Sequence, residues 1–385
     1  MAKQPLTIVI GAETFPPDVN GAAKFAVRLA AGLVGRGHRV VIIAPSPDKE
    51  FGLRRETHEG VEFEVYRLRS WKWFNHPWLR FALPWEVHPD TGAILDEVKP
   101  DVAHIQSHMN VGWGVAGQAH KRGIRLIATN HFMPENAAQF VPIPQFMIDL
   151  LVRMLWALAA KTYSRCDAVT TPTQKAADYL EEAVKISGVA AISCGLNVGN
   201  YKPVLGKRKD PYALFLGRVE QEKHIEELLF AASRFAPTEM RVVIAGAGDD
   251  KERLEKIVRD RGLTDRVHFT GHVDEEQLVT LLSEAAVFVM PSTAELQSIA
   301  TMEAMASALP VVAANAMALP HLVHDGDNGY LYEPRDIDGL VRGIRNVLEA
   351  TDERYLEMQR ESLAIVASHD IATTLDRFEE IYRGD

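Results

Sequence analysis

Cysteine is scarce in this chain, because only Cys166 and Cys194 occur among 385 residues. Two thiols without the spacing of a metal site indicate buried cysteines in a reducing compartment rather than a disulfide framework. The sequence also lacks any run of 18 apolar residues, and its N-terminus lacks the charged, apolar and small-residue order of a signal peptide. We therefore expect a cytoplasmic protein that spans no membrane.

An excess of positive charge is absent as well. The chain has 42 Lys and Arg against 52 Asp and Glu, which gives a formal charge of −10. Such a chain repels a polyanion unless its basic residues are segregated, so nucleic acid is a poor candidate partner. The composition, 47% hydrophobic and 24% charged, is typical of a soluble globular protein, and about 150 residues per domain predicts two or three domains.

The first half of the sequence alternates strand-like and helix-like segments. Leu6–Gly11 is apolar, and a loop rich in proline and glycine, a helical pattern that ends near Leu33 and the apolar run Val40–Ala44 follow it. This is the strand, helix, strand unit of a parallel sheet that is covered on both faces. The same rhythm recurs, so we predict a Rossmann-like α/β domain over residues 1–200.

The second half restarts the pattern after residues 199–211, a linker-like segment with two prolines, two glycines and four basic residues. Strand-like segments then alternate with helical ones from Tyr212–Leu216 through Pro310–Ala313. We predict a second Rossmann-like, doubly wound domain over residues 201–368 and a final helix within 369–385. Doubly wound sheets bind ligands at the carboxyl ends of their strands, so two facing domains would form a central cleft.

Two cations follow the first strand of the second domain. Arg218 and Lys223, five residues apart in LGRVEQEK, come directly after Tyr212–Leu216. A loop at the carboxyl end of a strand extends toward the ligand, and two cations there can neutralise a diphosphate. A solvated loop, in which Glu220 and Glu222 accompany these cations, is the alternative.

Two carboxylates surround the start of a later predicted helix. Glu295 precedes this helix and Glu303 lies within it, in AELQSIATMEAMA. The free amides at Gln297, Ser298 and Ile299 can bind an anion, and a carboxylate can bind the vicinal hydroxyls of a ribose. The alternative is that Glu295 only complements the helix dipole.

The first domain contributes Gly21 and His131. Gly21 opens a helix after a loop that two prolines stiffen, and glycine lets a phosphate or sugar approach the backbone. His131 follows the strand-like Leu126–Thr129 and is expected to point into the cleft, whereas His104 lies within a strand and is expected in the core. No helical histidine pair or cysteine partner supports a metal site, so none is predicted.

A nicotinamide site is disfavoured. Gly246-x-Gly248 follows a strand-like segment but lacks the third glycine of the dinucleotide fingerprint. The pair is more typical of a tight strand-to-helix turn, which weakens the hypothesis of a nicotinamide oxidoreductase.

In combination, these motifs resemble the family 4 retaining glycosyltransferases of the GT-B fold. The resemblance extends over nearly the whole chain and rests on the loop that ends at Gly21, on His131, on GRVEQEK, on Glu295 and Glu303, on EAMASALPVVA and on DGDNGYLY. It implies an acceptor-binding first domain, a second domain that binds a nucleotide-diphosphate sugar, and a last helix that crosses back to the first domain.

The resemblance also implies a role for each motif. Glu303 would hold the donor ribose, Arg218 and Lys223 the diphosphate, and Glu295 the hydroxyls of the transferred sugar. Gly21 would lie against the diphosphate and His131 near the C6 hydroxyl of the sugar. The implied catalytic residues are His131, Arg218, Lys223 and Glu295. The implied donor-binding residues are Gly21, Arg218, Lys223, Glu295, Gln297, Ser298, Ile299 and Glu303. In such enzymes the leaving group departs without a bound metal, so the resemblance implies no metal or other cofactor. The two cations and the helix dipole would then stabilise the departing phosphate.

The chain departs from the family pattern in two segments. The usual Phe-Gly-Leu after the first glutamate is Gln297-Ser298-Ile299 here, and the usual glycine after the phosphate-binding lysine is His224. With a glutamine at position 297, the chain resembles the subgroup that glycosylates diacylglycerol-type lipids.

Residues 66–85 support a lipid acceptor independently. This segment holds four of the six tryptophans, seven aromatic and four basic residues, and no acidic residue. Such a composition suits the interface of an anionic bilayer. The residues expected at the membrane or acceptor are Trp71, Trp73, Phe74, Trp78 and Arg80. The alternative is an insertion whose aromatic residues pack internally, and the helical stretch 140–161 is either a second wall of a lipid groove or a core helix.

The sequence thus predicts a metal-independent, retaining hexosyltransferase. It would move a hexose from a UDP-sugar or GDP-mannose to a hydroxyl of a membrane lipid such as diacylglycerol, as a peripheral protein on the inner face of the plasma membrane. The alternatives are transfer to a soluble acceptor, such as an oligosaccharide or cyclitol, and a sugar-nucleotide binding protein without catalysis.

Overall fold

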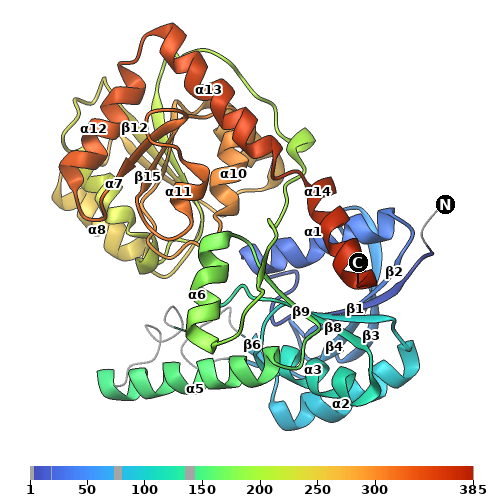
Figure 1. The fold of residues 1–385 in the computed structure, drawn as a ribbon. Coiled ribbons are helices and arrows are strands. Elements are labelled where there is room, and N and C mark those ends of the chain that lie inside the picture. The colour runs from blue at the N-terminus through green and yellow to red at the C-terminus, as the bar shows by residue number, and fades with distance from the viewer. Residues whose placement is uncertain (1–3, 19, 73–79, 135–143, 385) are drawn as a thin grey trace. The chain divides into compact units, whose positions relative to one another are not determined.

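The computed structural model describes residues 4–18, 20–72, 80–134 and 144–384. Contacts within the chain divide it into two compact units (Figure 1). The first unit comprises Met1–Cys194 with Ile371–Asp385, and the second comprises Gly195–Asp370. The final helix is therefore part of the first unit, although it follows the second in the sequence.

The first unit is built on an eight-stranded sheet in the order β10-β9-β8-β7-β1-β2-β4-β3. All neighbouring strands are parallel except β3 and β4, which form an antiparallel edge. The strands are β1 (Thr7–Gly11), β2 (Arg39–Pro45), β3 (Gly52–His58), β4 (Val61–Leu68), β7 (Val102–Ile105), β8 (Arg125–Thr129), β9 (Ala168–Thr171) and β10 (Ala190–Ala191). A separate ribbon pairs β5 (Trp71–Lys72) with β6 (Arg80–Phe81). Central strands such as β2 are nearly continuous apolar runs because helices cover both faces of a parallel sheet.

The helices of the first unit that the structure describes are α1 (Gly21–Gly35), α2 (Pro84–Val98), α3 (Asn110–Arg122), α5 (Gln145–Tyr163), α6 (Gln174–Val184) and α14 (Ile371–Arg383). Asn20 starts α1, because its side chain accepts a hydrogen bond of 2.9 Å from the Ala23 amide. The last helix, α14, packs beside α1 (Figure 1). A Cβ atom at Gly32 would lie 2.5 Å from Leu375, so glycine is what lets these two helices approach closely.

The second unit has a six-stranded parallel sheet in the order β13-β12-β11-β14-β15-β16. Its strands are β11 (Tyr212–Leu216), β12 (Arg241–Ala245), β13 (Val267–Gly271), β14 (Val287–Met290), β15 (Val311–Ala314) and β16 (Gly329–Tyr332). Its helices are α7 (Ile225–Ala232), α8 (Lys251–Asp260), α9 (Glu275–Glu284), α10 (Ile299–Ala306), α11 (Leu319–Leu322), α12 (Ile337–Leu348) and α13 (Asp352–Ala367), with 3-10 turns at Val198–Asn200 and Gln221–Lys223. The predicted α/β class with Rossmann-like parallel sheets is confirmed.

The segment 199–211, which resembled a linker, belongs entirely to the second unit. Tyr201 is buried in the hydrophobic core of that unit. The Gln359 side chain donates to the Val204 carbonyl at 3.0 Å and accepts from the Gly206 amide at 2.7 Å. These contacts tie the segment to α13, so its turn-forming composition does not mark the crossing between units.

Among the described residues, no helix is long and apolar enough to cross a membrane.

Candidate donor site

The sheet of the second unit reverses its strand order between β11 and β14. In a doubly wound sheet, the loops that follow the two strands at such a reversal diverge and leave a crevice at their carboxyl ends, where ligands bind. One of these loops carries Arg218 and Lys223, and the other carries Glu295 through Ser298. The topology therefore brings together two motifs that are 72 residues apart in the sequence.

Two glycines after β12 hold the first of these loops in place. The Asp250 amide donates to the Val219 carbonyl, and the Val219 amide donates to the Ala247 carbonyl, both at 3.0 Å. A Cβ atom at Gly248 would lie 2.2 Å from the Val219 carbonyl oxygen, and one at Gly246 would lie 1.8 Å from the Gly217 oxygen. Gly246-x-Gly248 is thus a close turn that supports the loop after β11, as the incomplete fingerprint indicated.

Lys223 and Glu295 form an ion pair across the two loops. The Lys223 ammonium lies 2.6 Å from Glu295 Oε1, and the two side chains are only 13% and 12% exposed. Burial alone would raise the pKa of Glu295, but the charge and hydrogen bond of Lys223 bring it below its usual value. Glu295 is therefore ionised at neutral pH and holds the Lys223 ammonium beside the loop that follows β14.

Arg218 is more accessible than Lys223. Its side chain is 41% exposed, and its guanidinium lies 2.7 Å from a carboxylate oxygen of Glu222. The alternative of a solvated loop predicts that glutamate accompanies these cations, and the Arg218–Glu222 ion pair is present. The same geometry holds the guanidinium beside Lys223, whose ammonium lies 3.8 Å from Glu222.

The start of α10 has an unusual backbone. Ser298, just before the helix, has φ 75° and ψ 81°, in the left-handed region that favours glycine. Its hydroxyl lies 2.8 Å from that of Thr301. Gln297 is buried, with its amide nitrogen 3.5 Å from His369 Nδ1, and Ile299 is the first residue of α10.

Glu303 lies inside α10 and is 1% exposed. A carboxyl group this far from solvent requires polar partners, from the protein or from a ligand.

Gly21 and His131 belong to the first unit. Gly21 is the exposed first residue of α1. His131 is half-buried after β8, its Nε2 lies 3.1 Å from Gln106 Oε1, and its ring centroid lies 4.8 Å from that of Phe25. Burial lowers the pKa of His131 to about 4, so the ring is neutral at physiological pH. His104 is fully buried, as expected of a core residue.

The aromatic and basic segment is only partly described. Trp71, in β5, is 48% exposed. Arg80, in β6, donates to the Ser70 hydroxyl at 2.8 Å and is thus part of the local framework. Trp73, Phe74 and Trp78 lie outside the described residues.

Helix α5 differs between its two halves. Trp156, Ala159 and Tyr163 in its second half are buried, as in a core helix. The first half exposes large apolar side chains, namely Phe146 (71%), Met147 (43%), Leu150 (57%) and Met154 (55%). Phe146, Leu150 and Met154 recur every four residues and therefore share one face of the helix.

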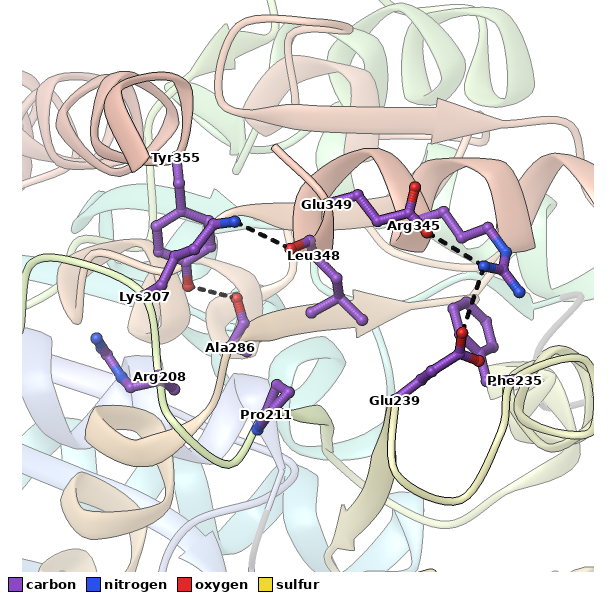
Figure 2. A pocket seen from close by; sticks show the side chains of 10 residues that line it. All are labelled: Lys207, Arg208, Pro211, Phe235, Glu239, Ala286, Arg345, Leu348, Glu349 and Tyr355. Carbon is purple, nitrogen blue, oxygen red and sulfur yellow. Dashed lines mark hydrogen bonds and ion pairs between the residues drawn. The ribbon is translucent and has the colours of Figure 1, made fainter. Parts of the chain in front are cut away.

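A cavity of about 220 Å³ lies elsewhere in the second unit. Its walls include Pro211 and Ala286, which immediately precede β11 and β14, so it lies at the amino ends of the strands. Figure 2 shows that its polar groups contact one another: Lys207 donates to the Leu348 carbonyl at 3.2 Å, and the Tyr355 hydroxyl to the Ala286 carbonyl at 2.6 Å. This cavity is therefore at the opposite ends of the strands from the loops that carry Lys223 and Glu295.

Among the described residues, no group of three or more His, Cys, Asp or Glu side chains is placed to hold a metal ion.

Sequence reasoning missed two contacts near the candidate residues. His224 follows Lys223 in the left-handed region, φ 48°, and its Nε2 lies 3.1 Å from the Thr293 hydroxyl in the loop after β14. Gln106, the residue after β7, contacts His131. Its place directly after a strand is the only signal in the sequence that could have identified it.

Family models match almost the whole chain in two adjacent segments. Residues 19–199 match the model described as Glycosyltransferase Family 4, and residues 197–362 match the one described as Glycosyl transferases group 1. The chain belongs to the family 4 glycosyltransferases. This membership makes it an enzyme that transfers a sugar from a nucleotide sugar.

Curated relatives align with this glycosyltransferase over most of its length. A GDP-mannose-dependent alpha-mannosyltransferase of Mycolicibacterium smegmatis is 27% identical over 87% of this chain and 85% of the relative. A glycogen synthase of Mycobacterium tuberculosis is 32% identical over 91% and 88%. The alpha-monoglucosyldiacylglycerol synthase of Acholeplasma laidlawii is 24% identical over 86% of each.

Solved structures confirm the GT-B fold of this glycosyltransferase. Sucrose-phosphate synthase from Thermosynechococcus elongatus matches with a TM-score of 0.80 at 21% identity over 99% of both chains. Anabaena HepE in complex with UDP-glucose matches with a TM-score of 0.75 at 16% identity, over 99% of this chain and 100% of that one.

Proposed function

We propose that this glycosyltransferase moves a hexose from a UDP-sugar or GDP-mannose to a hydroxyl of a membrane lipid such as diacylglycerol, with retention of configuration and without a metal. The largely buried Lys223–Glu295 ion pair beside the start of α10 carries the donor half of this proposal. The names of two similar proteins support it, since one is a GDP-mannose-dependent transferase and the other a complex with UDP-glucose.

The donor diphosphate would bind between Arg218, Lys223 and the amides at the start of α10. Charge-assisted bonds from two cations and the positive end of a helix favour an oxyanion at this point. Glu303, buried within α10, would accept hydrogen bonds from the ribose hydroxyls, and Glu295 from hydroxyls of the sugar. The roles of Gly21 and His131 in the first unit stay predictions.

The proposed reaction is a front-face displacement. The acceptor oxygen bonds to the anomeric carbon while the bond from that carbon to the β-phosphate oxygen breaks, and the departing phosphate takes the acceptor proton. Because both groups occupy the same face of an oxocarbenium-like carbon, the configuration is retained. Arg218 and Lys223 stabilise the charge that develops on the phosphate. Glu295 is held by Lys223 at 2.6 Å, which suits a binding carboxylate better than a nucleophile.

The exposed apolar face of α5 supports a lipid acceptor. Phe146, Leu150 and Met154 present a continuous apolar stripe, and the exposed Arg153 lies beside it. Aromatic and aliphatic side chains flanked by a basic residue suit the boundary between lipid headgroups and acyl chains. Exposed Trp71 belongs to the same unit, and one relative is a diacylglycerol glycoside synthase by name.

Substitutions of the two central donor residues test the donor half. We expect Lys223→Ala to lower kcat by about 10² to 10³, since one electrostatic contact to the leaving group is lost. We expect Glu303→Ala to raise the KM for the donor, because it removes a ribose contact. Transfer from a labelled nucleotide sugar measures both, with Lys256→Ala on the exposed surface of α8 as the control. Wild-type turnover in Lys223→Ala would reject the assignment.

A further inference from the structure

A buried chain of polar side chains runs from α14 to His131 inside the first unit. The Tyr382 hydroxyl lies 2.7 Å from His104 Nδ1, and His104 Nε2 lies 3.4 Å from the amide nitrogen of Gln106. The amide oxygen of Gln106 lies 3.1 Å from His131 Nε2. Tyr382, His104 and Gln106 are each at most 3% exposed, so solvent cannot replace these contacts.

The chemistry of the amide group assigns the direction of each bond. An amide oxygen only accepts, so His131 donates from Nε2–H to Gln106. An amide nitrogen only donates, so His104 Nε2 is an acceptor and His104 carries its hydrogen on Nδ1. That Nδ1–H donates to the Tyr382 oxygen. The Thr129 hydroxyl, 2.7 Å from His104 Nε2, donates to the same nitrogen.

Both histidines are neutral in this arrangement. Burial lowers the pKa of His104 to about 3 and that of His131 to about 4. Each ring therefore carries a single hydrogen on nitrogen, and the hydrogen bonds described above determine which nitrogen holds it. With Nε2–H donated to Gln106, His131 keeps Nδ1 as an unprotonated acceptor.

We propose that Gln106, His104 and Tyr382 are positioning residues that fix His131 in its Nε2–H tautomer, so that its Nδ1 accepts a hydrogen bond from a hydroxyl of the transferred sugar. This proposal rests on the proposed function, in which His131 contacts that sugar. It assigns α14 a part in the reaction, because the chain of contacts begins at Tyr382, which does not touch His131. Rings of Phe378 and Phe25 flank the two histidines and keep them in place, with centroids 5.2 Å from His104 and 4.8 Å from His131.

Nitrogen NMR of the full chain labelled with ¹⁵N-histidine tests the tautomer directly, because protonated and unprotonated ring nitrogens give well-separated signals. The His131 signals are identified by their loss in His131→Gln. We expect protonated Nε2 and unprotonated Nδ1 in the wild type. Gln106→Leu removes the acceptor, so a mixture of tautomers is expected. Gln106→Glu keeps an acceptor and should keep Nε2–H.

Tyr382→Phe tests whether Tyr382 is coupled to His131 through His104 and Gln106. Without the hydroxyl, His104 is free to move its hydrogen to Nε2 and donate to Thr129, which removes the acceptor of the Gln106 amide group. We expect His131 to become a tautomer mixture and kcat to fall about tenfold, in line with one lost hydrogen bond. Tyr355→Phe is the matched control, since it also removes one buried hydroxyl bond, to Ala286 in the second unit, and should change neither readout.

The ring signals and the turnover separate the two proposals. A wild-type His131 protonated on Nδ1, or His131 signals that are unchanged in both Gln106→Leu and Tyr382→Phe, would overturn the positioning proposal. An absence of transfer from every donor, with the expected ring signals present, would overturn the proposed function and leave the tautomer assignment standing.

Discussion

At the scale of single residues, the candidate donor site contains backbone conformations that its side chains do not favour. Ser298, at the start of α10, and His224, after Lys223, both have positive φ, and at both positions this chain replaces a glycine that is usual in the family. Unfavourable backbone geometry of this kind persists where the surrounding structure imposes it, often at functional sites. At Ser298 the hydroxyl contact with Thr301, 2.8 Å, accompanies this geometry.

Ser298→Gly and Ser298→Ala should therefore differ in stability. Both variants lose the contact with Thr301, but only glycine removes the Cβ atom that disfavours φ 75°. We expect the glycine variant to have a free energy of unfolding about 1 kcal/mol higher than the alanine variant. Urea unfolding of the two proteins measures this difference, and an alanine variant of equal or greater stability would show that residue 298 is not strained.

At the scale of elements, the sequence predicted what is periodic or local. The buried strands β1, β2 and β11, the turn at Gly246 to Gly248 and the helix that carries Glu303 all follow from patterns within a few residues. The Lys223–Glu295 pair could not be predicted, because its partners meet only through the strand order of the second sheet. The contact of Gln106 with His131 depends in the same way on β7 and β8 being neighbours.

Helix α5 illustrates the limit of composition. Its sequence was compatible with either a core helix or a lipid groove, and the structure shows that its second half is buried while its first half is exposed. The same apolar composition serves both environments, so only tertiary contacts distinguish them.

The exposed face of α5 should contribute to membrane binding. We expect the double variant Phe146→Ser and Leu150→Ser to bind vesicles of anionic phospholipid at least tenfold more weakly, because it removes two large apolar side chains from the interface. Sedimentation with vesicles gives the bound fraction. The matched control is Val204→Ser and Leu205→Ser, which removes two exposed apolar side chains of the second unit, 40% and 52% accessible. Equal binding by both double variants would reject α5 as the membrane-binding element.

At the scale of the whole molecule, buried neutral histidines link stability to pH. Burial lowers the pKa of His104 to about 3 and those of His108, His131 and His369 to about 4. In the unfolded chain these rings take up protons near their ordinary value of about 6.5. Their contribution to stability is thus fully present above about pH 6.5 and is lost as the pH falls toward 4.

We therefore expect Tm to fall progressively between pH 6.5 and pH 4.5. Glu13 acts in the opposite direction, because burial raises its pKa from 4.5 to about 7. Between these values its carboxyl group ionises in the unfolded chain but stays protonated in the folded protein, so this group lowers stability as the pH rises. Burial also raises the pKa values of Asp18, Asp90 and Glu227, and a hydrogen bond to Glu226 raises that of His224, so these groups act in the same direction as Glu13. Burial lowers the pKa values of His88 and His321, which act with the other histidines. We expect the four strongly lowered histidine pKa values to decide the sign. Calorimetry across this range measures the trend, with His268→Gln, at an exposed position, as a variant whose pH profile should match the wild type. A Tm that is constant or rises as the pH falls would contradict this account.

A donor-by-acceptor screen tests the central claim of lipid glycosylation most directly. The purified chain with EDTA would be incubated with UDP-sugars and GDP-mannose, and with mixed micelles of diacylglycerol beside soluble oligosaccharides and cyclitols, and the products would be identified by mass spectrometry. The account predicts a glycolipid that keeps the anomeric configuration of the donor and is formed in the presence of EDTA. Product on a soluble acceptor alone, or product only after a divalent metal is restored, would contradict it.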